Sequence, residues 1–173
     1  MEKIKKLKQI IKLHNLDGYI VPKNDEFFSE FVESEKDDLK FISNFSGSYG
    51  FAIILTNSNY LLVDGRYTLQ AKLESKNFKI IDMYKKTYFK IFKNKKLKIG
   101  YCPKLFTSLT LKRIFSKTSL NTIPIEENFI DKIRTKKISK KPKKIFSLSD
   151  KVAGQSPKKK IEILIKNLKK KKL

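Results

Sequence analysis

The stretch FISNFSGSYGFAIILTNSNYLLVDGRYTLQ, residues 41–70, decides the fold. It contains two short apolar runs, residues 51–55 and 60–63, in which β-branched and aromatic side chains are frequent. Both runs are bounded by Gly, Asn and Ser, which is typical of strands that are joined by a tight turn. The stretch therefore predicts two neighbouring β-strands.

Charged residues follow the second strand directly, before a helix expected over residues 67–75. They belong to the segment Asp64, Gly65, Arg66 and Tyr67. Charged side chains at the carboxyl end of a strand are often functional in α/β folds. In the structural alternative, Asp64 caps the helix and Gly65 forms the turn. The residues alone leave both interpretations open.

Helical and strand patterns alternate on either side of this stretch. Upstream, residues 1–14 have apolar residues at helical spacing, and residues 17–22 form a short apolar strand. Downstream, we expect the following elements in order: strand 78–82, helix 84–92, strand 97–101, helix 108–117, strand 120–125 and a short helix over 128–134. This alternation predicts an α/β fold in which helices flank a mixed β-sheet.

Seven acidic residues gather in residues 23–40. Asn24 or Asp25 is a suitable N-cap for a helix that runs through Phe31 and Val32. The carboxylates have no fixed polar partner in the sequence pattern, so we interpret them as a solvated acidic face.

The composition changes after residue 135. Residues 136–144 are polar and basic and contain Pro142, which is typical of a linker, and residues 145–148 predict a short strand. Ser156 and Pro157 then suit the N-cap and first position of an amphipathic helix. We expect a first domain over residues 1–135, a basic linker with a short strand over 136–156, and the first helix of a truncated second domain over 157–173.

The formal net charge of +23 raises the possibility of a nucleic-acid partner. The charge is uneven, because residues 132–144 hold eight basic residues and no acidic one, and residues 158–172 hold eight against Glu162 alone. All but three of the 40 basic residues are Lys, whereas readers of bases and phosphates favour Arg. A free-standing Lys-rich module that binds nucleic acid or another anionic surface is therefore the alternative function.

The chain has one cysteine and one histidine, which limits the disulfides, metal sites and catalytic groups that it can form. Cys102 is the only cysteine and His14 the only histidine, which excludes an internal disulfide and a His-rich metal site. No constellation of nucleophile, base and orienting group is present, so we expect neither catalytic residues nor metal ligands. The sequence has no apolar run as long as a membrane span and no signal-peptide core, so we expect a cytoplasmic protein.

These stretches together resemble the N-terminal domain of three-domain Xaa-Pro aminopeptidases (aminopeptidase P), members of the creatinase/prolidase group. The resemblance extends over nearly the whole chain, and the order and spacing of its motifs make it specific. It includes residues 41–50 and 62–71. The other matching segments are residues 16–22, 25–32, 123–133 and 156–173.

The resemblance implies a creatinase/prolidase N-terminal domain with ribonuclease H-like layering. In that family the chemistry resides in a C-terminal domain that holds two divalent metals, typically Mn²⁺, and we expect this chain to lack that domain. The resemblance therefore implies a non-catalytic domain that supports dimerisation and shapes the site for Xaa-Pro peptides. Its partners would be a second copy or a chain with the catalytic domain. Asp64, Arg66 and Tyr67 are the residues expected near substrate.

Overall fold

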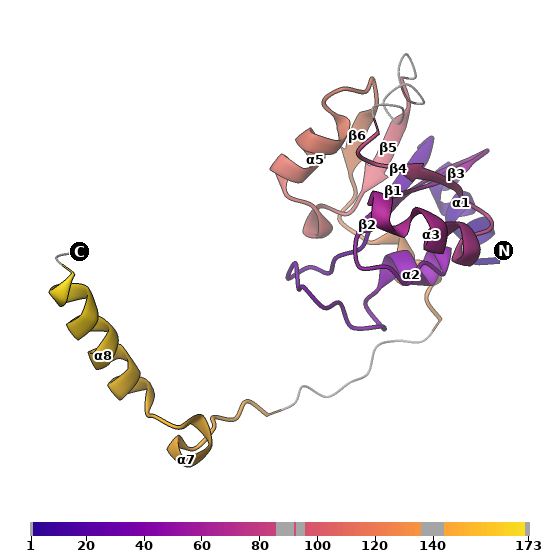
Figure 1. Cartoon of the computed structure of the whole chain (residues 1–173). Coiled ribbons are helices and arrows are strands. Elements are labelled where there is room, and N and C mark those ends of the chain that lie inside the picture. The colour runs from indigo at the N-terminus through magenta and orange to yellow at the C-terminus, as the bar shows by residue number, and fades with distance from the viewer. Residues whose placement is uncertain (1, 86–91, 93–95, 136–143, 172–173) are drawn as a thin grey trace. The chain divides into compact units, whose positions relative to one another are not determined.

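The structure, a computed structural model, describes residues 2–85, 92, 96–135 and 144–171. Its centre is a six-stranded sheet in the order β4-β3-β2-β1-β5-β6 (Figure 1). The strands are β1 (Gly18–Pro22), β2 (Gly50–Leu55), β3 (Asn59–Val63), β4 (Lys79–Asp82), β5 (Lys98–Tyr101) and β6 (Asn121–Pro124). The pairs β1–β2 and β2–β3 are antiparallel, and the other pairs are parallel. The predicted mixed sheet is therefore confirmed.

The central hairpin is formed by β2 and β3. Ala52 lies opposite Leu61 in its register, and the amide of Leu55 donates to the carbonyl of Ser58 across the turn at 2.8 Å. Side chains alternate between the two faces of a strand, and here every residue of β2 is buried. A strand that is buried on both faces needs a layer of structure on each side.

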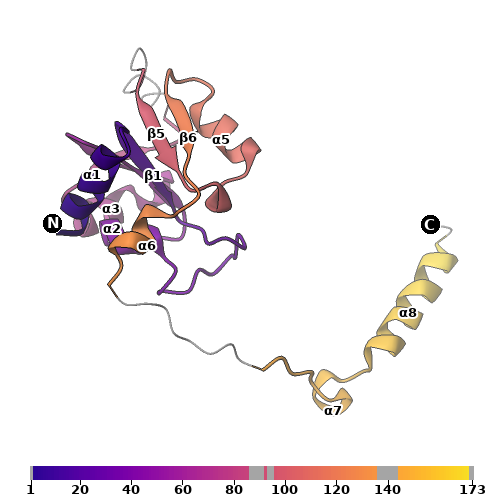
Figure 2. The same ribbon diagram turned by 180° about the vertical axis from the view of Figure 1, so that it is seen from behind.

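The first layer consists of α1 (Glu2–Leu13), α2 (Asp38–Ser43), α3 (Thr68–Glu74) and α6 (Phe129–Ile133). Their buried apolar side chains pack on the sheet face that carries Tyr19, Val21 and Ile54. Figure 2 shows α1 and α6 next to each other on this side, and contacts between them support the view. Leu7 and Ile11 are fully buried, so the amphipathic pattern of the first helix serves the core.

The second layer consists of η2 (Pro103–Leu105) and α5 (Ser108–Phe115). Leu105, Phe106 and Phe115 pack with Phe92 on the face that carries Ile20 and Ile53. The sheet therefore lies between two layers, as expected for an α/β fold with helices on both faces.

Two predicted elements are wrong. Residues 24–37 form turns and bends instead of a helix, because the Asp25 carboxylate accepts hydrogen bonds from the amides of Phe27 and Ser29, both at 3.0 Å. Such local bonds compete with a helix. Residues 145–148 form no strand. The helix expected over residues 84–92 lies largely outside the described residues.

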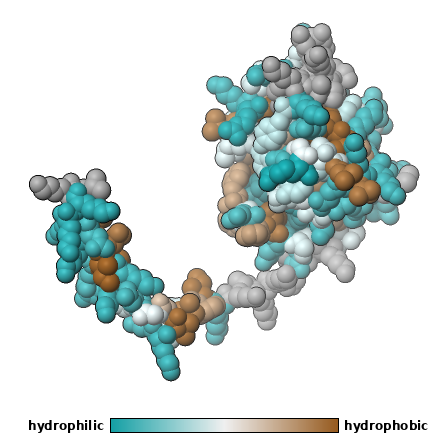
Figure 3. All heavy atoms as spheres, in the orientation of Figure 1, coloured by the Kyte–Doolittle hydropathy of each residue, from teal (hydrophilic) through white to brown (hydrophobic). Residues whose placement is uncertain are grey.

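The chain divides into two compact units, Met1–Ile138 and Ser139–Leu173. The second unit contains α7 (Asp150–Ala153) and α8 (Pro157–Lys170). The Ser156 hydroxyl accepts from the Lys159 amide at 3.2 Å, which confirms the predicted cap. Figure 3 shows apolar side chains along one side of α8. Two of the apolar residues of this helix, Leu164 and Leu168, stay about half exposed. In the described part of the chain, no helix combines the length and apolarity that a membrane span requires.

Candidate functional site

The Asp64–Tyr67 segment lies at the carboxyl end of β3, where the strand turns into η1 (Gly65–Tyr67). The Asp64 carboxylate accepts from the Arg66 amide at 3.0 Å, so it caps this turn. The same carboxylate accepts from the Arg66 guanidinium twice, Nε to Oδ1 at 3.0 Å and Nη2 to Oδ2 at 3.2 Å. The capping alternative is therefore confirmed, and Asp64 additionally fixes the direction of the Arg66 side chain.

Arg66 stays accessible although it is paired, with 75% of its side chain exposed. Hydrogen bonding to Arg66 lowers the pKa of Asp64, and hydrogen bonding to Asp64 raises the pKa of Arg66. A two-point contact with a carboxylate orients a guanidinium more strictly than a single contact does. The Asp64–Tyr67 segment, called the Arg66 corner below, thus presents a cation that is permanently charged, held in one direction and accessible.

Tyr67 connects this corner to the glycine-containing loop before β2. Its hydroxyl lies 2.7 Å from the Ser48 hydroxyl, and its ring meets the edge of the Phe45 ring at 5.8 Å between centroids. The Arg66 guanidinium lies 5.6 Å from the centre of the Tyr67 ring. Two segments that are about twenty residues apart in sequence therefore form one surface.

Glu74 at the end of α3 fastens the same loop. Its two carboxylate oxygens accept from the amide and from the hydroxyl of Ser46, both at 2.7 Å. Gln70 donates to both Ser46 and Glu74, at 2.8 and 3.0 Å. Burial on its own would raise the pKa of Glu74, but the hydrogen bonds from Ser46 and Gln70 lower it. The sequence did not single out this pair, although both residues lie within or beside the stretches that decide the fold.

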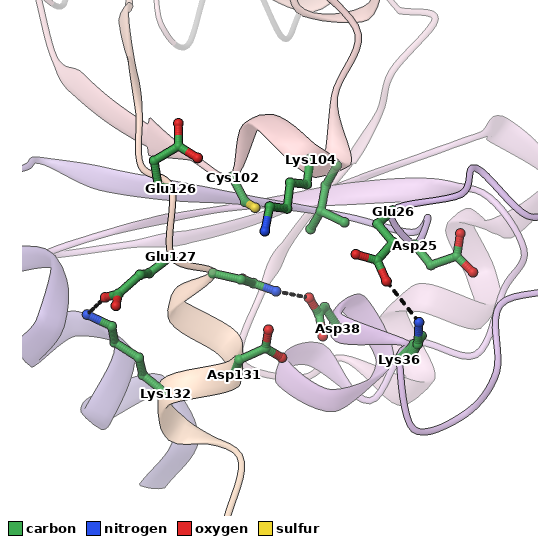
Figure 4. Close-up of a pocket in the computed structure, with 12 residues that line it drawn as sticks. Asp25, Glu26, Lys36, Asp38, Cys102, Lys104, Glu126, Glu127, Asp131 and Lys132 are labelled. Carbon is green, nitrogen blue, oxygen red and sulfur yellow. Dashed lines mark hydrogen bonds and ion pairs between the residues drawn. The ribbon is translucent and has the colours of Figure 1, made fainter. Parts of the chain in front are cut away.

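A second candidate is a cleft of about 510 Å³ that is lined by the acidic loop of residues 24–37, Asp38 at the start of α2, η2, and residues in and before α6. Figure 4 shows Asp38 of α2, Lys104 of η2 and Asp131 of α6 pointing into it. Other carboxylates at its rim are paired, Glu26 with Lys36 at 3.1 Å and Glu127 with Lys132. The lining nevertheless holds six carboxylates and only three lysines, so the cleft keeps an excess of negative charge.

Three acidic residues of the segment 23–40, Asp25, Asp37 and Asp38, are buried, contrary to the predicted solvated face. Asp38 accepts from Asn128 Nδ2 at 2.6 Å and from Arg134 Nη2 at 2.7 Å. Burial raises the pKa of Asp38, although the hydrogen bonds from Asn128 and Arg134 act in the opposite direction. Asn128 also accepts from the Tyr19 hydroxyl at 3.3 Å. The scarcity of Arg in the sequence was the only signal that could have pointed to Arg134 here.

Neither His14 nor Cys102 is placed for catalysis. The ring of His14 packs on that of Phe129, with centroids 4.7 Å apart. Cys102 is buried, and burial raises the pKa of its thiol, so the nucleophilic thiolate is disfavoured. Across residues 2–85, 92, 96–135 and 144–171, no group of three His, Cys, Asp or Glu side chains is arranged to hold a metal ion.

Known proteins resemble this chain in sequence and in fold. The model of the creatinase/prolidase N-terminal domain matches residues 3–136. A probable Xaa-Pro aminopeptidase P from Laccaria bicolor is 34% identical over 99% of this chain and 28% of its own length. Xaa-Pro aminopeptidase 1 from Dictyostelium discoideum is 31% identical over 98% of this chain and 30% of its own length. The chain thus spans less than a third of these relatives.

Solved structures agree with the sequence comparison. An X-prolyl aminopeptidase from Caenorhabditis elegans, described as a cytosolic enzyme with a di-nuclear active site, covers 99% of this chain with a TM-score of 0.72 and 26% identity. This chain covers 31% of that structure. An aminopeptidase P structure from Streptococcus thermophilus covers 78% of this chain with a TM-score of 0.58 and 22% identity, and this chain covers 97% of it, which supports the fold alone. None of these similarities supports the Lys-rich binding module. The chain belongs to the creatinase/prolidase N-terminal domain family, and its relatives are Xaa-Pro aminopeptidases.

Proposed function

We propose that this chain is the non-catalytic N-terminal domain of an Xaa-Pro aminopeptidase and helps to shape the site that receives the peptide. The observation that carries the proposal is the alignment of 99% of the chain with only 28% of an Xaa-Pro aminopeptidase P. Such an enzyme removes the residue that precedes proline at a peptide's N-terminus. In this proposal the chain binds and positions, and it breaks no bond itself.

Arg66 is the residue we assign to the substrate side. Its guanidinium is exposed, and Asp64 holds it in one direction through two hydrogen bonds. Such a group suits a peptide carboxylate or carbonyl oxygen. Tyr67 supports the arrangement, because its bond to Ser48 joins the turn to the neighbouring loop.

The metal chemistry belongs elsewhere in this proposal. The described residues offer no ligand cluster and therefore do not fit a two-metal centre. We propose that two divalent ions, Mn²⁺ in the simplest case, are held by a catalytic domain outside this chain. The partner is then a polypeptide with that domain or a second copy, and the place of action is the cytoplasm, as the description of the nematode enzyme supports.

The first test is an assay of the purified chain with Mn²⁺ and an Xaa-Pro peptide. We expect no hydrolysis, because the chain would carry no catalytic centre. Hydrolysis that persists in repurified chain and disappears on chelation would overturn the proposal.

A chimera gives the positive test. The Laccaria bicolor relative is expressed with this chain in place of the segment that aligns with it. We expect the chimera to hydrolyse Xaa-Pro peptides, and we expect the relative without either segment to be much less active. A folded, metal-loaded chimera that is no more active than the truncated relative would contradict the proposed role.

A further inference from the structure

A basic groove lies at one end of the sheet and consists of two adjoining hollows, of about 510 and 310 Å³. We define it by Lys5, Lys8 and Lys12 of α1, Asn59 at the start of β3, and Lys76 and Lys79 around the start of β4. Lys8 and Asn59 line both hollows, so the two form one continuous depression.

The groove and Arg66 lie at opposite ends of the strands β3 and β4. β3 begins at Asn59 and ends at Val63, immediately before the Asp64 turn. β4 runs parallel to β3, so Lys79 lies at the same end as Asn59. The groove and the Arg66 corner therefore occupy opposite ends of the same strands, and an inference about the groove does not depend on the proposed function.

The cations of the groove are not neutralised by neighbours. Within the described residues, no ion pair joins Lys5, Lys8, Lys12 or Lys76 to a carboxylate, and no Asp or Glu lines either hollow. Lys8 is half-buried, and burial together with the charge of Lys12 lowers its pKa. Like charges that are held together without a counter-charge favour an anionic ligand.

Neutral polar groups complete the lining. They include Thr56, Asn57, Ser58, Asn59 and Asn77, and Asn59 Nδ2 donates to the Asn77 carbonyl at 3.0 Å. Amide and hydroxyl groups between lysines are the kind of lining that binds phosphate oxygens. Lys5 and Lys12 are seven residues apart on one helix, which is about 10 Å along its axis. That span exceeds a single phosphate group.

We propose that the basic groove binds a small ligand with a chain of two or more phosphate groups. Inorganic polyphosphate and a nucleoside polyphosphate share this chemistry. The lysines supply point charges along the phosphate chain, and polar side chains that line the groove with them, such as Thr56 and Asn77, can donate hydrogen bonds.

Calorimetric titration of the full chain tests the proposal, with inorganic tripolyphosphate in one arm and a nucleoside triphosphate in the other. We expect saturable binding of one ligand per chain that weakens as salt is added. Equal affinities would show that the phosphates alone are recognised, and a tighter nucleotide would show that its sugar or base also contributes. Either result supports the groove, and no saturable binding in either arm overturns it.

A matched pair of variants locates the site. The triple variant K5Q/K8Q/K12Q should weaken tripolyphosphate binding by at least about tenfold. The control K159Q/K166Q/K170Q removes the same charge from α8 and should change the affinity by less than about twofold. Equal losses would mean that net charge, not the groove, attracts the ligand.

Two further measurements keep the result decisive. If the triple variant is less stable than the wild type, the single substitution Lys12→Glu, at an exposed position, takes its place. In addition, backbone chemical shifts of the wild type are followed during the titration. Ligand-induced shifts should cluster in α1 and residues 56–59, and shifts confined to other regions would refute the site. Single-stranded RNA that binds much more tightly than tripolyphosphate and is equally sensitive to K5Q/K8Q/K12Q would assign the groove to a nucleic acid instead.

Discussion

The guanidinium of Arg134 lies 2.7 Å from the carboxylate of Asp38, although the two residues are 96 positions apart in the sequence. Both side chains are largely buried, with 12% and 6% exposed. Asn128 donates to the other oxygen of the same carboxylate. The pair therefore fastens α6, near the end of the first unit, to α2.

Removal of the cation should destabilise the domain strongly. Arg134→Met leaves Asp38 as a buried carboxylate without its ion-pair partner, and loss of one partner of a buried pair costs about 3–5 kcal/mol. Unfolding in urea, followed by circular dichroism, measures the loss. Arg113→Met is the control, because Arg113 is exposed on α5 and its loss should change stability by less than about 0.5 kcal/mol. Equal effects of the two substitutions would contradict the role of the pair.

The Glu74 contact with Ser46 should appear in the pH dependence of stability. The pKa of Glu74 lies below its ordinary value of 4.5 in the folded chain. The unfolded state therefore binds the proton more readily, so the stabilisation is complete above the unfolded pKa and is lost as the pH falls through the folded pKa. Glu74→Gln should remove this part of the acid sensitivity.

The measurement compares unfolding free energies of the two proteins from neutral pH to pH values below 4.5. Glu33→Gln is the matched control, because Glu33 is exposed and its side chain makes no hydrogen bond or ion pair within the described residues. Glu74→Gln should flatten the acid limb, whereas Glu33→Gln should leave it unchanged. Parallel curves for the wild type and Glu74→Gln would refute the prediction.

Local pattern was sufficient to predict the sheet. The apolar run of residues 51–55 indicates a buried strand, because it is short, rich in large apolar side chains and bounded by turn residues. The Ser156 cap and Pro157 likewise determine the start of α8 from neighbouring residues alone. Elements defined by adjacent residues are the ones that a sequence pattern describes best.

Contacts between residues far apart in the sequence, and hydrogen bonds made by individual side chains, could not be predicted from the hydrophobic pattern. Asp38 was grouped with a solvated acidic face, because its partners Asn128 and Arg134 are far away in sequence. Residues 24–37 had the composition of a capped helix, but the Asp25 carboxylate accepts from the amides of Phe27 and Ser29, and Phe27 and Phe31 stay exposed. In the corner, the sequence located Asp64 and Arg66 but could not distinguish capping from pairing, and the structure has both.

Gly18 should tolerate no side chain. A Cβ at this position would lie 2.8 Å from the Ile54 carbonyl and 2.6 Å from Leu55 Cδ2, inside the β1–β2 pair. We expect Gly18→Ala to cost about 1–3 kcal/mol, as other overpacking changes do. At Gly65 the nearest atom is a carboxylate oxygen of Asp82 at 3.1 Å, which can move, so Gly65→Ala should cost less in the same denaturation assay. The opposite order would show that the strand pair adjusts more easily than the Asp82 side chain.

Arg66 should matter for activity and little for stability. Its side chain is mostly exposed, and exposed ion pairs contribute little to stability because solvent screens them, so Arg66→Met should leave the unfolding midpoint of the chain nearly unchanged. In the chimera the same substitution should raise KM or lower kcat for Xaa-Pro peptides. Arg66→Lys keeps the charge but loses the two-point contact with Asp64, so it should be intermediate.

The comparison of the two assays separates a role toward substrate from a role in folding. Arg113→Met serves as the control in the chimera, because it removes an exposed cation from α5, away from the Asp64 turn. If Arg66 positions the peptide, activity falls in the order wild type, Arg66→Lys, Arg66→Met while stability stays level. If activity falls only as far as stability does, or if Arg113→Met reduces it equally, the guanidinium has no specific part in the site and the exposed pair with Asp64 serves only the turn.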